Sequence, residues 1–151
     1  MTFCGCSDEF GSAERVLGRI CESLEMPSGS VYFCGAEEGQ EGYLSPITAS
    51  VLYGEEEWKE IIPLLQDYAI YISRFAAPYE AAVFKCYSRS DADAVGALFL
   101  ARAESISVLI KDTDYASLTG KVSIFSRGRY VAMVFCDDPE RAEESIKKAL
   151  N

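Results

Sequence analysis

The sequence predicts an α+β fold: a two-layer arrangement with an antiparallel sheet of about four strands and helices chiefly on one face. Segments with helical apolar spacing and segments with alternating apolar spacing occupy different parts of the chain. Between Tyr79 and Cys136 the pattern is a strand, a long amphipathic helix, and a hairpin that turns at Arg127–Gly128. The first two main strands are separated by a connection so short that antiparallel neighbours are favoured.

The length and composition predict a single domain. A chain of 151 residues, 49% of them apolar, can bury a substantial core. No repeat, linker or low-complexity segment divides it. We expect residues 1–11 to be a flexible amino-terminal segment, a remnant of a lipoprotein signal in one interpretation, and residues 12–151 to form one α+β domain.

The amino-terminal part is predicted to be mainly helical. Residues 12–26 carry apolar side chains at helical spacing, and residues 31–34 form a short apolar run typical of an edge strand. Ser45–Pro46 supplies a hydroxyl cap and a proline for the start of a short helix. A second helix is expected over residues 56–65, with glutamates in its positive first turn.

Four main strands are expected over residues 68–75, 79–87, 121–126 and 130–136. The long helix between the second and third is expected to open at Ser90, where Asp93 completes a capping-box pattern. The last helix then follows the Asp138–Pro139 pair.

The strands are apolar on both faces, as Val83 beside Phe84 and Ile124 beside Phe125 illustrate. Such strands need cover on both faces. If helices cover one face, the other must meet the amino-terminal segment or another subunit. We therefore expect a homodimer that forms through the sheet face.

Charge and residue content exclude several function classes. The net charge is −10, so nucleic acid and anionic membrane surfaces are not expected partners. Histidine is absent, which excludes hydrolases that use a Ser-His or Cys-His pair. No C-x-x-C occurs, and the sequence predicts no metal site, no cofactor and no catalytic residues. Cys21, Cys86 and Cys136 lie in apolar runs and are interpreted as small buried hydrophobes.

The amino terminus resembles the end of a bacterial lipoprotein signal. In Phe3–Asp8, an apolar, a variable and a small residue precede Cys6, which would be the lipidated residue. The basic and apolar regions of such a signal are missing. If an upstream signal exists, the protein is membrane-anchored outside the cytoplasm through that lipid alone; otherwise this is an ordinary cytoplasmic terminus.

Longer motifs resemble the bacterial lipoprotein family known as domain of unknown function 4358. They are Glu80–Lys85, the helix that carries Arg102, Lys121–Val131, the closing segment Asp137–Leu150 and, more loosely, Leu52–Gly54. The resemblance covers somewhat over half the chain. It implies a surface lipoprotein, since members often carry lipoprotein signals, and no activity, because none is established for the family. The chain departs from the family in lacking the full signal.

Arg102 is the candidate ligand-binding residue. Counting from Val95 at 3.6 residues per turn puts its charge in the middle of the apolar stripe of the long helix. Such a charge must reach solvent, pair with a carboxylate, or bind an anion. One interpretation is a structural pair with an acid such as Glu80; the other is an anion-binding pocket.

Two function classes remain open. The first is a non-enzymatic binding or interaction module for an unknown protein or small ligand, held at the cell surface if Cys6 is lipidated. The second is a small ligand-sensing or carboxylate-dependent enzyme domain with an anion site at Arg102. A deep pocket with converging carboxylates would favour the second, and an exposed apolar face would favour the first.

Overall fold

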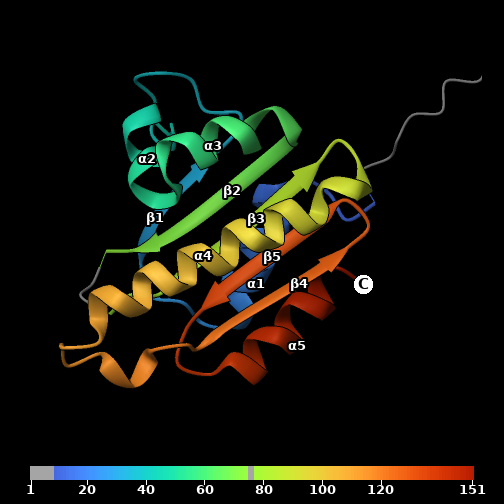
Figure 1. Cartoon of the computed structure of the whole chain (residues 1–151). Helices are drawn as coiled ribbons and strands as arrows, with labels where there is room; N and C mark the ends of the chain where they lie inside the picture. The colour runs from blue at the N-terminus through green and yellow to red at the C-terminus, as the bar shows by residue number, and fades with distance from the viewer. Residues whose placement is uncertain (1–8, 75–76) are drawn as a thin grey trace, which may run out of the picture.

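A computed structural model describes residues 9–74 and 77–151. In this part of the chain, five strands form one antiparallel sheet in the order β1-β2-β3-β5-β4 (Figure 1). The strands are β1 (Gly29–Phe33), β2 (Leu65–Ser73), β3 (Glu80–Cys86), β4 (Val122–Arg127) and β5 (Tyr130–Phe135). The α-helices are α1 (Ala13–Ser23), α2 (Pro46–Tyr53), α3 (Glu55–Ile61), α4 (Ala92–Ile110) and α5 (Pro139–Ala149). The α+β class and the antiparallel sheet are confirmed, with five strands instead of about four because the short β1 pairs with β2.

Helices cover both faces of the sheet, so the fold has three layers and the expectation of helices chiefly on one face was wrong. Helices α1 and α5 pack on one face, and α2, α3 and α4 pack on the other (Figure 1). The reason lies in the strands. Neighbouring residues such as Val83 and Phe84 point to opposite faces and are both 0% exposed, so each face needs its own cover.

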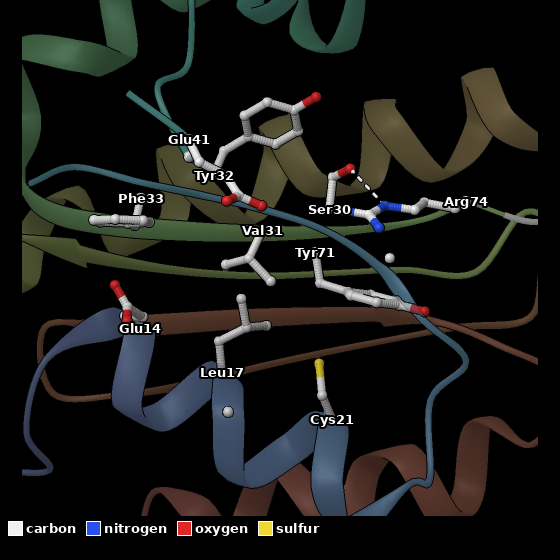
Figure 2. A pocket seen from close by; sticks show the side chains of 13 residues that line it. Glu14, Leu17, Cys21, Ser30, Val31, Tyr32, Phe33, Glu41, Tyr71 and Arg74 are labelled. Atoms are coloured by element: carbon white, nitrogen blue, oxygen red, sulfur yellow. Dashed lines mark hydrogen bonds between the residues drawn. The ribbon is translucent and has the colours of Figure 1, made fainter. Parts of the chain in front are cut away.

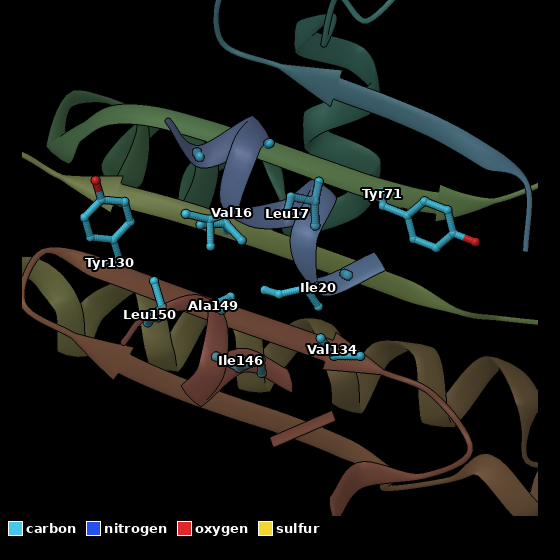
Figure 3. Close-up of a cluster of buried hydrophobic side chains, with 14 of the residues drawn as sticks. Val16, Leu17, Ile20, Tyr71, Tyr130, Val134, Ile146, Ala149 and Leu150 are labelled. Atoms are coloured by element: carbon cyan, nitrogen blue, oxygen red, sulfur yellow. The ribbon is translucent and has the colours of Figure 1, made fainter. Parts of the chain in front are cut away.

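The face that prompted the homodimer expectation is covered by the chain itself. Its side chains pack against α1, from the amino-terminal part, and against α5. Figure 3 shows this cluster, in which Val16, Ile20 and Ile146 from the helices lie with Tyr130 and Val134 of the sheet. The sheet face therefore no longer argues for a partner subunit, and the homodimer remains an untested prediction.

Three predicted helix starts are confirmed by their hydrogen bonds. The side chains of Ser12, Ser45 and Asp138 each accept a hydrogen bond from the backbone N–H three residues later, at 3.1 Å. These caps satisfy backbone groups that a helix leaves unpaired at its first turn. They fix where α1, α2 and α5 begin.

The predicted capping box at the start of the long helix was wrong. α4 begins at Ala92, and its N-cap residue Asp91 makes no side-chain cap bond. Ser90 instead belongs to a short 3-10 turn, Arg89–Asp91, whose cap is Ser88. The hydroxyl of Ser88 accepts from the Ser90 N–H and lies 2.8 Å from the Ser90 hydroxyl, so the local side chains favour a tight turn before the helix.

Candidate functional site

Strand β1 lies beyond the cover of the helices on the α1 side of the sheet. On that face α1 packs chiefly over β2 and β3, and α5 over β4 and β5. Two helices side by side span about 20 Å, whereas five strands span about 24 Å. The edge strand is therefore left outside, and Val31 on it is 40% exposed.

The uncovered strand forms one wall of a cleft, and α1 forms the other (Figure 2). The cleft has a volume of about 840 Å³. Its apolar lining comes from three elements: Leu17 and Cys21 of α1, Val31 and Phe33 of β1, and Tyr71 of β2. The Tyr71 ring lies on the same sheet face as Val31, its partner in the strand register. The cleft therefore has an apolar lining that is open to solvent along β1.

Charged side chains stand at the two ends of this cleft. Figure 2 shows Glu14 and Glu41 toward the end that holds Phe33, and Arg74 toward the opposite end. All three charged residues are exposed. The Arg74 Nε donates a long hydrogen bond of 3.4 Å to the Ser30 hydroxyl. The cleft thus has an acidic end and a basic end.

Two glycines shape the cleft in opposite ways. Gly42 has a φ of +91°, and a Cβ there would lie 2.3 Å from an atom of the Phe33 ring, so only glycine fits. Gly18 lies on the cleft side of α1, where a Cβ would meet nothing within 4 Å. A side chain introduced at Gly18 would therefore grow into open space.

Cys21 supplies no nucleophile to the cleft. Burial raises the pKa of its thiol from an ordinary value of 9.0 to about 12. At neutral pH the group is a protonated thiol, whereas the thiolate is the reactive form. The residue therefore acts as part of the apolar wall.

The raised thiol pKa predicts a loss of stability in alkali. Between pH 9 and pH 12 the folded chain keeps the Cys21 proton that the unfolded chain releases. The contribution of this group to the free energy of unfolding is therefore fully present below pH 9 and is lost as the pH rises toward 12. The slope is at most about 1.4 kcal/mol per pH unit for this group. Burial also raises the pKa of Cys86 to about 11 and that of Tyr68 to about 12, which steepens the fall.

Urea unfolding at pH 8, 9, 10 and 11 measures this slope. We expect the variant Cys21→Ala to lose stability less steeply than the parent chain above pH 9. Parallel curves for the two proteins would contradict the assignment.

Arg102 forms the pair with Glu80 that one interpretation of the sequence predicted. Its Nε donates to Glu80 Oε2 at 2.9 Å and its Nη2 donates to Oε1 at 2.8 Å. The Arg102 side chain is 13% exposed and that of Glu80 is 3% exposed. Burial alone lowers the pKa of Arg102, but the bonds and the charge of Glu80 outweigh burial and raise it. The fork of the guanidinium is thus occupied by a carboxylate.

The surroundings of this pair offer little room. The cavity beside it measures about 150 Å³ and is lined by both partners together with apolar residues such as Ile106 and Leu109. Tyr53 lies near the pair, and its buried hydroxyl has no hydrogen-bond partner among the described residues. Burial, and then the charge of Glu80, raise the pKa of Tyr53. The place fits a structural ion pair better than an anion site.

The remaining predicted site residue, Cys6, lies outside the described residues. The described part of the chain begins at residue 9. There, Phe10 makes an edge-on contact with Tyr130, and the Tyr130 hydroxyl donates to the Gly11 carbonyl at 2.7 Å. Within the described ranges, no three metal-ligating side chains gather in one place. No helix in those ranges combines the length and apolarity that a membrane span requires.

Comparison with known proteins found no match to a family model, a curated protein or a solved structure. The resemblance to domain of unknown function 4358 therefore remains a prediction that depends on the motifs quoted above.

Sequence reasoning missed the cleft. Its signals were present but weak: Gly18 interrupts an otherwise regular helix, and Val31–Phe33 is apolar on both faces of a short strand. Neither pattern indicates that the two segments face each other, because that depends on which strands α1 covers.

Proposed function

We propose that this protein is a non-catalytic binding module and that the cleft between α1 and β1 is its binding site. One observation carries the proposal: an apolar cleft of about 840 Å³ lies open beside a strand that no helix covers on the α1 side of the sheet. Ligand sites in proteins are typically concave and mainly apolar, with volumes of about 300–1,000 Å³ and a few polar groups that orient the ligand. Glu14, Glu41 and Arg74 are such groups.

The chemistry of the cleft supports binding without catalysis. Its carboxylates, Glu14 and Glu41, are exposed at the rim and no described base stands beside Cys21, whose thiol is protonated. General acid–base chemistry needs positioned groups with suitable pKa values. The alternative function, an anion-sensing domain at Arg102, is less well supported because Glu80 already takes the guanidinium fork.

Exposed apolar side chains elsewhere agree with an interaction protein but define no site. Ile47 and Val51 on α2 are 78% and 76% exposed, and Val108 and Leu109 on α4 are 64% and 73% exposed. The hollow beside Ile47 and Val51 measures about 450 Å³, has Ser50 and Glu55 as its polar groups, and is smaller than the cleft. Attachment to a cell surface through Cys6 is a separate proposal that rests on the sequence alone.

Filling the cleft from Gly18 tests the proposal. We expect the neutral apolar dye Nile red to bind the parent protein saturably and to bind Gly18→Phe at least tenfold more weakly, because the new ring occupies the cleft. Helix propensity favours phenylalanine over glycine, so the fold should be retained. Fluorescence titration measures the affinity, and thermal unfolding checks the fold.

Gly96→Phe is the matched control. Gly96 also lies within a helix, α4, and a Cβ there would meet nothing within 4 Å. It lines no part of the cleft. We expect this variant to bind the dye like the parent. Equal dye binding by all three proteins would refute the assignment of the cleft.

A further inference from the structure

The outer edge of β1 offers unpaired main-chain groups. In an antiparallel sheet, the backbone N–H and C=O groups of successive residues along an edge strand point alternately toward the neighbouring strand and toward the outside. The Cys34 N–H donates to Tyr68 of the β2 segment, whereas the Phe33 N–H points outward and donates to the Gly42 carbonyl. The alternation places the N–H and C=O of Gly29 and Val31 outward as well.

These outward groups have no described partner. No backbone hydrogen bond joins Gly29 or Val31 to another described residue on that side. All five residues of β1 line the cleft, including Ser30 and Tyr32, whose side chains stand on the other face of the sheet. The cleft therefore follows the main chain of β1 as well as its side chains.

Gly42 limits the open edge at one end. Because its carbonyl already accepts from Phe33, a new strand could pair only with the stretch from Gly29 to Val31. The same contact disfavours a second copy of this chain as the occupant. A symmetric antiparallel pair centred on Val31 would bring Gly42 of each copy against Gly29 of the other.

The charges fit one direction of an added strand. β1 runs from the Arg74 end of the cleft to the Glu14 and Glu41 end (Figure 2). A strand antiparallel to β1 starts at the acidic end and finishes at Arg74. Charge complementarity then favours a basic residue early in the strand and an acidic residue late in it.

We infer that the occupant of the cleft is an extended peptide that pairs antiparallel with Gly29–Val31. This inference rests on the proposed function. The peptide has the pattern basic–x–apolar–x–acidic: its last three residues pair with β1, and its first two, which unlike the folded backbone of a second copy are free to bend, pass Gly42 toward Glu14 and Glu41. Its apolar residue lies opposite Val31, on the α1 side, and reaches Leu17 and Tyr71. The main-chain bonds supply affinity, and the alternate side chains supply specificity, as in other cases of strand addition.

The test uses the acetylated and amidated peptide Lys-Ser-Leu-Ser-Asp and two N-methylated forms of it. Methylation at the leucine removes the N–H that the Val31 carbonyl would accept, and we expect it to weaken binding about tenfold, as the loss of one hydrogen bond does. Methylation at the second serine alters an N–H that points away from β1, and we expect less than a threefold change. Calorimetry measures all three affinities, and the reversed sequence Asp-Ser-Leu-Ser-Lys should bind more weakly than the parent peptide.

The outcomes separate this inference from the proposed function. If the two methylated peptides bind equally while Gly18→Phe still weakens Nile red, strand addition is wrong and the binding site stands. If no peptide binds while the dye does, the peptide class is wrong. If light scattering detects a homodimer, and the peptide binds only as that dimer dissociates, a second copy is the occupant and the inference fails. If neither dye nor peptide responds to Gly18→Phe, both proposals fail.

Discussion

Replacing Arg102 by leucine is expected to lower the free energy of unfolding by about 3–5 kcal/mol, because a buried ion pair that loses one partner leaves an unpaired charge. The remaining carboxylate, Glu80, is 3% exposed and would keep neither of its two guanidinium bonds. Urea unfolding followed by the fluorescence of Trp58 measures the change. We expect the folded variant to bind Nile red like the parent, since Arg102 does not line the α1–β1 cleft.

Two further variants make this result specific. Glu80→Leu combined with Arg102→Leu removes both charges, and we expect it to recover most of the loss, because apolar replacement of a whole buried pair is often neutral. Lys147→Ala breaks an exposed pair with Glu143 on α5 and should cost less than about 1 kcal/mol. If the single Arg102 variant were as mild as Lys147→Ala, the pair would not be a structural element of the core.

Replacing Phe84 by alanine is expected to cost about 3–5 kcal/mol, the range for deletion of a buried aromatic ring. Phe84 on β3 is 0% exposed. Its ring centroid lies 4.7 Å from that of Phe99, 5.7 Å from that of Tyr53 and 6.1 Å from that of Trp58. The ring thus joins the sheet to α2, α3 and α4, and its loss would leave a cavity between them.

The matched controls for this variant are one conservative and one exposed change. Phe84→Leu keeps most of the volume and should cost less than about 1.5 kcal/mol. Tyr87→Ala removes an aromatic ring that is 63% exposed and should change stability by less than about 0.5 kcal/mol. Urea unfolding of the three variants ranks them, and equal losses for Phe84→Ala and Phe84→Leu would show that the core closes around the deletion.

Local pattern was enough to predict most elements of this fold. Ser45–Pro46 and Asp138 start helices because their side chains act on backbone groups only three residues away. Along β2, the two-residue repeat of a strand separates the faces: Ile70 packs with the α4 side of the sheet, and Tyr71 packs with the α1 side. Both kinds of signal lie within a few residues, which is why a single sequence reveals them.

Layering and the cleft depend on contacts between distant segments. The spacing of Val16 and Ile20 shows which face of α1 is buried, but it does not show that this face lies over β2 and β3. The pairing of Gly29–Phe33 with Ala69–Ser73 spans the α2 and α3 helices and leaves no local signature. The Arg102–Glu80 pair could be predicted because a charge on an apolar stripe requires a partner, and the nearest buried strand offered one.

The path of the chain around β1 has a consequence for the order of folding. The β2–β3 and β4–β5 hairpins join segments that are close in sequence, whereas β1 reaches β2 only after the chain has passed through residues 34–64. Closing a long loop costs entropy before its contacts stabilise it, so pairings of this kind tend to form late. One wall of the cleft is α1 and the other is β1, so the cleft is complete only after this late pairing. Affinity at the cleft would then belong to the finished fold and to no earlier intermediate.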